Sequence, residues 1–416
     1  MRTITRDGTL FPELSATLLY FIKKLHQNLE DGNIDKVYFL SREGQPLKKL
    51  YDMYVNKVGG GASSYYLEVS RRSTLLPSLG PLEEESFHTL FRQYRSISLI
   101  EFLSSLGLEE YLGAILEPLA LQTGEEAARE DDFMQSRAFR RLVQLPQFQE
   151  LYENERIRRK KAFVCYLKLV SKGIIPSRLV IVDVGWKGTI QDNLYRILCD
   201  GSEALAEEII GYYIGLVSQG LTEKGNVKHG LIFSIPGKRS PKYRIFNENR
   251  ALFETILAAD HGSIQSYGLT AEGHGYAIRG TFDEKVMIDE YILPLQKDLF
   301  QQYRELLWMT SSNHQHCRAD FKKVVKGHSR MVFKPTQQER RWFSSIYHVE
   351  NFGVFEQSTF TVSSLSSSVM GRILFILRLV HRRRQADLGF WPWNTIYEKS
   401  GLFPAMIYGM IRRFQA

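Results

Sequence analysis

The sequence has few cysteines and no long apolar run. Its three cysteines, Cys165, Cys199 and Cys317, are too few and too scattered for a disulfide framework or a thiolate metal site, and this usage indicates a reducing compartment. No stretch approaches the roughly 18 apolar residues of a membrane span, and the N-terminus lacks the apolar centre of a signal peptide. We therefore expect a cytoplasmic protein, either free or in peripheral contact with the inner face of the membrane.

Motifs of several common protein classes are also missing. The chain has no helix-turn-helix, zinc-finger or RNP-type sequence, and neither a GxGxxG fingerprint nor a DxD metal motif. The net charge is nevertheless +8, with a pI near 9.1. Such a balance indicates phosphate-bearing partners. With nucleic acid disfavoured by the missing motifs, an anionic lipid or a phosphorylated small molecule remains.

The composition is that of a globular protein with more than one unit. Hydrophobic residues make up 44% and charged residues 24%, and 416 residues exceed the usual size of a single core. The periodicity predicts an α/β fold with a parallel sheet, a helical insertion and a mainly helical C-terminal region. We expect the first part of the α/β core at 1–83, the helical insertion at 84–172, the second part of the core at 173–284 and the C-terminal region at 285–416.

Strands of the predicted core are short and apolar without alternation, as is typical of a parallel sheet covered on both faces. A helix with apolar residues at helical spacing precedes the first strand, and another helix starts near Pro46. The predicted helix and strands are Leu14–Leu29, Val37–Leu40, Tyr65–Val69, Leu179–Val182, Ile209–Leu216 and Leu231–Phe233.

The most informative stretch is LVIVDVGWKGTI, which runs from Leu179 to Ile190. It predicts a buried strand, a glycine-bearing turn and the start of a helix. Gly185 and Gly188 allow the backbone to approach a ligand closely, and the N-terminus of the helix favours an anion. Asp183 lies at the carboxyl end of the strand, where a carboxylate can hold sugar hydroxyls or a magnesium ion. An ordinary strand-to-helix turn is the structural alternative.

A second strand also ends in a loop with glycine and charge, in the segment FLSREG. Ser41, Arg42, Glu43 and Gly44 form this loop. Because ligands collect at the carboxyl edge of an open α/β sheet, we expect the two loops to face each other across one ligand with phosphate at both ends. Arg71 and Arg72, predicted to end a third strand, add forked donors suited to pyrophosphate.

These motifs resemble those of the phosphoribosyltransferases, in which an apolar strand with acidic residues leads into a turn of the form D-V-x-x-T-G. Asp183 to Gly188 match that spacing, although Val182 replaces one acid and Lys187 replaces the threonine. A closer resemblance is to the glycan-associated phosphoribosyltransferases of bacterial surface-polysaccharide clusters. It extends over most of residues 10–405 and is carried by YFLSREGQPLKKLY, YYLEVSRRS, VDVGWKGTIQ, FETILAADHGSIQSY and FWPWNTIYEKSG.

The resemblance implies a phosphoribosyltransferase-like core and transfer of a 5-phosphoribofuranosyl group from phosphoribosyl pyrophosphate (PRPP) to a glycan hydroxyl, inverting to a β-ribofuranoside, in O-antigen or capsule biosynthesis. The acceptor would be carried on a polyprenyl lipid. Magnesium would be the cofactor, held by Asp183 with the substrate. A separate phosphatase of the haloacid-dehalogenase type would remove the 5-phosphate, because this sequence contains no DxDxT motif.

Site residues follow from the same match. The 5-phosphate loop would comprise Gly185, Trp186, Lys187, Gly188 and Thr189, and the pyrophosphate site Ser41, Arg42, Glu43, Gly44, Arg71 and Arg72. Glu254 and His261 are candidates for the general base, with Asp183 and Glu43 as alternatives. Two other functions stay open: a nucleotide-sugar-dependent glycosyltransferase of surface polysaccharides, and a non-catalytic PRPP-binding regulator.

Overall fold

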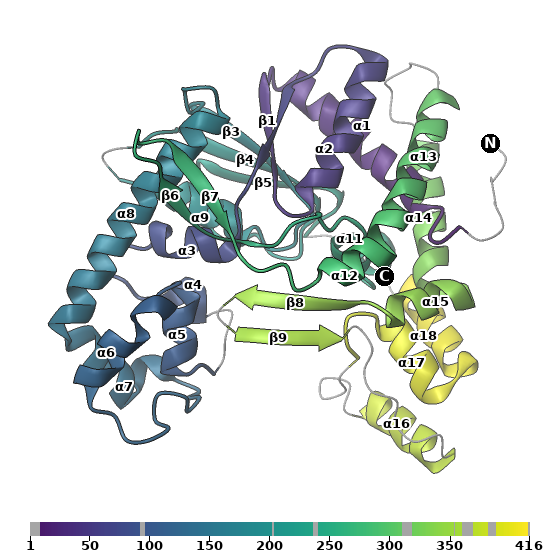
Figure 1. The fold of residues 1–416 in the computed structure, drawn as a ribbon. Coiled ribbons are helices and arrows are strands. Elements are labelled where there is room, and N and C mark those ends of the chain that lie inside the picture. The colour runs from purple at the N-terminus through teal and green to yellow at the C-terminus, as the bar shows by residue number, and fades with distance from the viewer. Residues whose placement is uncertain are drawn as a thin grey trace.

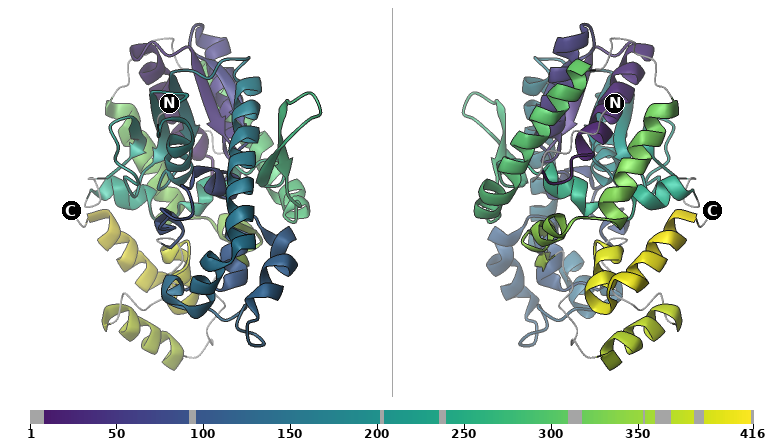
Figure 2. Two further views of the ribbon diagram at one scale, coloured as in Figure 1. Left: turned by 90° about the vertical axis from the view of Figure 1, so that its left-hand side faces the viewer. Right: turned by 90° about the vertical axis from the view of Figure 1, so that its right-hand side faces the viewer.

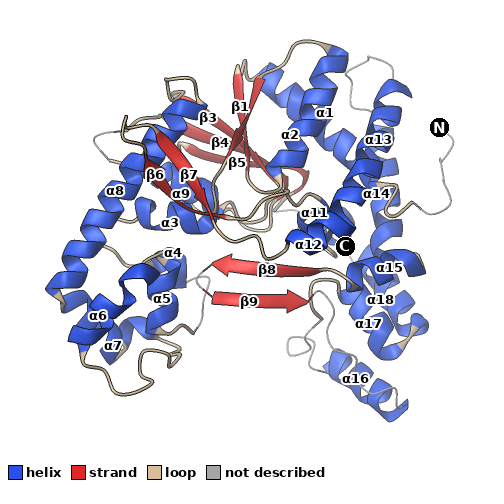
Figure 3. Ribbon diagram, in the orientation of Figure 1, coloured by secondary structure: helices blue, strands red, loops and turns tan. Residues whose placement is uncertain are grey.

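The computed structural model is an α/β protein with a five-stranded parallel sheet and a mainly helical C-terminal region (Figures 1 and 3). The structure describes residues 9–91, 96–201, 204–235, 240–309, 318–352, 354–359, 369–381 and 388–414. Arg382 to Arg384, a basic run in the sequence, lie outside the described residues.

The strand order of the sheet is β2-β1-β3-β4-β5, and all neighbouring strands are parallel. In the pairing of β1 with β3, Phe39 lies beside Val182. The chain runs from β1 to β2 on one side and from β3 to β5 on the other, so the connections reverse direction between β1 and β3. Ligands of open α/β sheets bind outside the carboxyl ends of the strands at such a switch point. The five strands are β1 (Lys36–Leu40), β2 (Ser63–Leu67), β3 (Arg178–Asp183), β4 (Glu208–Gly215) and β5 (Asn226–Phe233).

Helices cover both faces of this sheet, which explains why its strands are apolar throughout. Alternate residues of β1 and β3, such as Phe39 and Val182, pack in one cluster with α1 (Leu14–Asp31) and α2 (Gly44–Val58). Their neighbours, such as Tyr38, pack in another with α8 (Pro146–Val170) and α9 (Thr189–Leu198). The predicted strands of the core are therefore confirmed, with ends shifted by one to several residues.

Between β2 and β3 the chain is helical, and its aromatic residues form a cluster of their own around Phe87, Phe102 and Tyr152. Figure 1 shows most of these helices at one side of the molecule, near the lower end of the long helix α8. The segment contains α3 (Arg71–Ser78), α4 (His88–Phe91), α5 (Leu99–Ser105), η1 (Glu109–Tyr111), α6 (Leu112–Leu119), η2 (Phe133–Gln135), α7 (Arg137–Gln144) and α8.

After β5 the part of the chain that the structure describes contains two hairpins that the sequence analysis did not predict. The strands β6 (Ile264–Leu269) and β7 (Gly275–Arg279) pair antiparallel and pack against α8, and β8 (Tyr347–Phe352) pairs with β9 (Val354–Thr359). The other elements are α10 (Pro241–Phe246), α11 (Ala251–Ile256), α12 (Lys285–Met287), η4 (Ile288–Ile292), α13 (Leu293–Met309), α14 (Arg318–Phe333), α15 (Gln337–Ser344), α16 (Val369–His381), α17 (Pro392–Ser400) and α18 (Leu402–Phe414).

Helices α16 to α18 lie together at one end of the molecule (Figure 2). Over the ranges that the structure describes, no helix is both long enough and apolar enough to cross a lipid bilayer.

Candidate functional site

A cavity of about 440 Å³ lies at the carboxyl edge of the sheet, beside the switch point. This volume is within the range of small-molecule sites. The loops that follow β1 and β3 both line it, as do the first residues of α3. The residues that line it are Ser41, Arg42, Glu43, Val69, Ser70, Arg71, Arg72, Asp183, Val184, Gly185, Trp186, Lys187, Gly188, Thr189, Ile190, Arg250, Glu254, Ser263 and Phe390.

The lining brings together most of the residues predicted to form the site. Gly44 and His261 are the two that it does not include. Five of the lining side chains are basic (Arg42, Arg71, Arg72, Lys187 and Arg250) and three are acidic (Glu43, Asp183 and Glu254). The excess of positive charge favours an anionic ligand.

Three helices begin at this cavity, because α2, α3 and α9 each follow a strand whose end borders it. Helix N-termini carry unpaired N–H groups and a partial positive charge, both of which favour anions. Ser70 caps α3 by accepting a hydrogen bond from the N–H of Ser73, whereas neither α2 nor α9 has a side-chain cap. The starts of α2 and α9 are therefore the two that an anionic ligand can cap.

The loop between β3 and α9 needs glycine at two positions. Gly185 has a φ of 143°, and a Cβ there would lie 2.4 Å from the carbonyl oxygen of Gly215. Gly188, the N-cap of α9, has a φ of 72°. Side chains rarely adopt such a φ, so both glycines are required by the backbone path of the loop.

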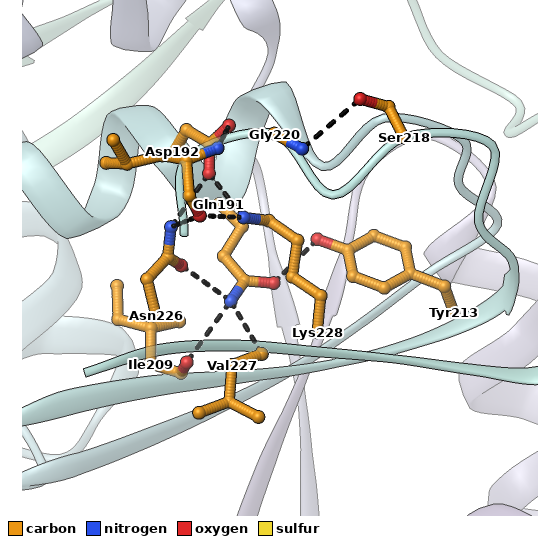
Figure 4. A network of polar contacts seen from close by, with 10 residues as sticks. Gln191, Asp192, Ile209, Tyr213, Ser218, Gly220, Asn226, Val227 and Lys228 are labelled. Atoms are coloured by element: carbon orange, nitrogen blue, oxygen red, sulfur yellow. Dashed lines mark hydrogen bonds and ion pairs between the residues drawn. The ribbon is translucent and has the colours of Figure 1, made fainter. Parts of the chain in front are cut away.

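A buried polar network fixes the start of α9 to β4 and β5 (Figure 4). The Gln191 amide nitrogen donates to the carbonyl oxygens of Ile209 (3.1 Å) and Val227 (2.9 Å), and its oxygen accepts from the Tyr213 hydroxyl at 2.8 Å. Asp192, the next residue of α9, accepts a hydrogen bond from Lys228 Nζ at 2.5 Å. This network holds α9 in register with the sheet, and the sequence analysis did not identify it.

Hydrogen bonds and an ion pair connect the loop that follows β1 to neighbouring segments. The Ser41 hydroxyl donates to the carbonyl oxygen of Val69 at 2.6 Å and accepts from the Val69 N–H at 3.0 Å. The Arg42 guanidinium forms an ion pair with the buried Glu284, at the start of α12. Ser41 thus joins the ends of β1 and β2, and Arg42 borders the cavity with one partner already in place.

The sequence analysis predicted that Arg71 and Arg72 end a strand, and this prediction is wrong. β2 ends at Leu67, and the two arginines form the first turn of α3. The reason is a capping box in which the side chains of Ser70 and Ser73 each accept a hydrogen bond from the other's N–H. Both arginines still line the cavity, and Arg72 also forms an ion pair with Glu109 of the helical segment.

Asp183 is buried and lines the cavity. Burial raises its pKa well above the usual value, and the nearby negative charge of Glu43 adds to the rise, while a hydrogen bond from the Val184 N–H opposes it. Glu254 raises the pKa further, and Arg71 lowers it. A carboxylate in this position gains stability from any cation or hydroxyl donor that enters the cavity.

The side chains of Trp186 and Glu254, which also line the cavity, are hydrogen-bonded to each other. The indole Nε1–H donates to Glu254 Oε1 at 2.5 Å, and the ring stacks on Phe233 with centroids 5.7 Å apart. The guanidinium of Arg250 lies over the same ring at 5.5 Å. Arg250, at the N-cap of α11, was not predicted from the sequence, although its spacing of four from Glu254 places both on one side of a helical turn.

His261 lies outside the lining of the cavity. Its Nε2 is 2.7 Å from the Tyr66 hydroxyl, its Nδ1 is 2.8 Å from the carbonyl oxygen of Gly262, and the side chain is buried. Burial lowers the pKa of His261. Both ring nitrogens therefore hold the loop before β6 in place, and the arrangement favours Glu254 over His261 as a group that meets a ligand.

Within the described ranges, no three His, Cys, Asp or Glu side chains are arranged to hold a metal ion. No model of a known protein family and no curated protein matches the chain.

Proposed function

We propose that the protein is a PRPP-dependent phosphoribosyltransferase that moves a 5-phosphoribofuranosyl group to a glycan hydroxyl in bacterial surface-polysaccharide biosynthesis. The proposal includes a phosphoribosyltransferase-like core. The sequence resemblance to the glycan-associated members of that class supports it. One observation carries it: the loops after β1 and β3 line a single basic cavity at the switch point of the sheet.

A ligand with phosphate at both ends matches this cavity. In the proposed complex, the backbone of residues 185–189, the Lys187 side chain and the start of α9 bind the 5-phosphate, since helix N-termini and glycine loops suit a phosphate. The start of α2 and Arg71 bind the pyrophosphate, with Arg42 and Arg72 adding positive charge behind them.

The chemistry of the reaction explains the mixture of charges. As the bond at the anomeric carbon breaks, positive charge grows on the ribose and negative charge grows on the leaving pyrophosphate. In our proposal Asp183, and Glu43 beside it, stabilise the ribose cation, and the arginines stabilise the leaving group. Attack from the face opposite pyrophosphate inverts the anomeric centre and gives a β-ribofuranoside.

A magnesium ion would fit this arrangement, with ligands from both the substrate and the protein. It prefers oxygen ligands and commonly binds through one or two carboxylates together with substrate phosphates. Asp183, with Glu43 close enough to raise its pKa, would supply the protein's ligands. When bound, the metal would neutralise charge on the pyrophosphate.

The acceptor in this proposal is carried on a polyprenyl lipid, and α18 presents a surface for such a membrane. Its inner face is anchored because the Arg412 guanidinium donates to the buried Glu248 at 3.1 Å. Its outer face is apolar and exposed along the whole helix, with Leu402, Phe403, Met406, Ile407, Met410, Ile411 and Phe414. A phosphatase of the haloacid-dehalogenase type would then remove the 5-phosphate, an activity for which this sequence has no DxDxT motif.

The test is to incubate the protein with PRPP, Mg²⁺ and a panel of candidate glycans, and to search by mass spectrometry for an acceptor that gains one phosphopentose. Consumption of a nucleotide sugar in place of PRPP would point to the other glycosyltransferase reaction. PRPP that binds without being consumed would indicate a regulator.

The role of Lys187 gives a second test of the donor position. Lys187 is exposed at the mouth of the cavity, with no ion-pair partner among the described residues. We expect Lys187→Ala to weaken PRPP binding by roughly 10- to 150-fold, since a charged hydrogen bond contributes about 1.5–3 kcal/mol, and to leave the melting temperature unchanged. Normal affinity in this variant would contradict our placement of the 5-phosphate.

A further inference from the structure

The three carboxylates of the cavity occupy different surroundings. Asp183 is buried, and burial favours its neutral form. Glu43 is the N-cap of α2, in the loop that we assign to the leaving pyrophosphate. Glu254 comes from α11, a separate element that Figure 1 shows well apart from α3, with the strand ends between them. Glu254 is therefore the one carboxylate of the three that lies outside the parts of the cavity assigned to the donor, and the Trp186 indole lies on the same side although the Trp186 backbone belongs to the 5-phosphate loop.

Glu254 is also held in a fixed position. The hydrogen bond from the Trp186 indole fixes one carboxylate oxygen, and the indole is itself fixed by stacking on Phe233 and by the guanidinium of Arg250 over its ring. A hydrogen bond donated to a carboxylate favours its charged form, which is the form that accepts a proton. Phe390, 45% exposed, borders the same cavity and adds a second aromatic side chain.

We infer that the wall formed by Trp186, Arg250, Glu254 and Phe390 is the acceptor-sugar subsite, and that Glu254 is the base that takes the proton of the attacking hydroxyl. This inference rests on the proposed function and adds to it the place of the acceptor and the identity of the base. Aromatic faces with a few fixed polar groups are the usual lining of small-molecule sites. Trp186 is then a positioning residue, acting through Glu254.

The step is balanced as follows. The acceptor oxygen forms a bond to the anomeric carbon of PRPP, while the bond from that carbon to pyrophosphate breaks and its electron pair leaves with pyrophosphate. The hydroxyl proton passes to the Glu254 carboxylate, which later releases it to solvent. With no acceptor sugar present, water takes the same place and gives ribose 5-phosphate.

Two variants separate this role from donor binding. Glu254→Gln keeps the shape of the side chain and removes the base, and Trp186→Phe keeps an aromatic ring and removes the N–H donor. The matched control is Glu272→Gln, an exposed carboxylate in the β6–β7 turn outside the lining of the cavity. The probes are PRPP with Mg²⁺, whose binding is measured by calorimetry, and methyl glycosides of common hexoses as acceptors, with PRPP hydrolysis as a second readout.

In Glu254→Gln we expect transfer and hydrolysis to fall by about 10²- to 10⁴-fold, the usual contribution of a general base, with the Kd of PRPP changed less than threefold. In Trp186→Phe we expect a smaller loss of kcat and a shift of the acid limb of its pH profile to higher pH, because the carboxylate loses a hydrogen bond that favours its charged form. Glu272→Gln should match the wild type in every measurement.

Other outcomes overturn the inference. Normal turnover in Glu254→Gln would show that another group is the base, and loss of PRPP binding in that variant would place Glu254 in the donor site. An unshifted pH profile in Trp186→Phe would reject the positioning role. These results test the inference when the wild-type protein uses PRPP. A wild-type protein that neither binds nor consumes PRPP would overturn the proposed function itself, and the inference with it.

Discussion

Asp183 is the residue at which the needs of stability and of the proposed function oppose each other. Burial and Glu43 raise its pKa well above the usual value, so the folded protein holds this proton more tightly than the unfolded chain does. The resulting stabilisation is fully present below the usual carboxyl pKa and is lost as the pH rises through the raised pKa. At neutral pH the side chain therefore lowers the stability of the protein without ligand.

From this we expect Asp183→Asn to raise the melting temperature at pH 7 to 8, where the wild type carries the cost of a buried charge, and to differ little from the wild type near pH 4. Turnover of PRPP should fall by about 10²-fold or more, since the carboxylate charge is lost. Thermal melts across this pH range, paired with pyrophosphate release assays, check both parts. A variant that is less stable at neutral pH, or that turns over normally, would contradict this account of Asp183.

A substitution at Gly185 tests the backbone path of the loop between β3 and α9. A Cβ at this position would meet the carbonyl oxygen of Gly215 at 2.4 Å, and the φ of 143° is one that other residues rarely adopt. We expect Gly185→Ala to lower the free energy of unfolding by about 2–4 kcal/mol and to weaken PRPP binding. The control is Gly113→Ala in α6, where a Cβ meets no atom within 4 Å. Chemical denaturation should show that variant equal to the wild type or more stable by up to about 1 kcal/mol.

At the scale of elements, the attachment of α9 to the sheet depends on one buried amide. Gln191 contacts backbone or side-chain atoms of β4 and β5 through both ends of its amide, while Asn226 Nδ2 and Lys228 Nζ bind the adjacent Asp192 (Figure 4). Replacing Gln191 by methionine leaves its buried partners, such as the Tyr213 hydroxyl, without a hydrogen bond. Each such loss costs about 1–3 kcal/mol.

The expected result for Gln191→Met is a loss of about 2–4 kcal/mol in the free energy of unfolding, measured with urea, together with weaker PRPP binding because the start of α9 is no longer fixed. Gln301→Met on the exposed side of α13 is the control and should change stability by less than about 0.5 kcal/mol. Unchanged stability in Gln191→Met would mean that the network contributes little to the fold.

For the whole molecule, the exposed apolar side of α18 predicts binding to membranes. Phe403 and Phe414, near the two ends of the helix, are 73% and 81% exposed. An amphipathic helix of this kind buries its apolar face in the headgroup region of a bilayer. We expect the protein to co-sediment with vesicles that contain phosphatidylglycerol, and the double variant Phe403→Ser, Phe414→Ser to bind at least tenfold more weakly while keeping its turnover of PRPP in solution.

The matched control is Ile157→Ser, which replaces an exposed apolar residue of α8, far from α18 in the sequence. Equal vesicle binding by the wild type and the double variant would show that α18 does not face the lipid. Tighter self-association of the wild type, seen by sedimentation and abolished in the double variant, would show that a second copy covers the helix instead.

The sequence by itself determined the elements whose pattern is local. Runs such as Leu179–Val182 specify a strand buried on both faces, and Gly185 and Gly188 mark the turn that follows, because apolar runs and glycine conformations act within a few residues. The same local signals predicted the loop at Ser41 to Gly44 and, through the rule for parallel sheets, a shared ligand edge. Most residues predicted for the two loops line one cavity in the structure.

Only the tertiary structure decided what depends on contacts between distant segments. The strand order, the pairing of Arg42 with Glu284 and the placement of Glu254 against Trp186 each join residues far apart in the chain. His261 and Glu254 are close in the sequence, and both were predicted as candidates for the general base. In the structure, however, His261 contacts Tyr66 and lies outside the cavity lining. The physical reason is that hydrophobic burial fixes how elements pack, and no local pattern of residues states which side chains that packing brings into contact.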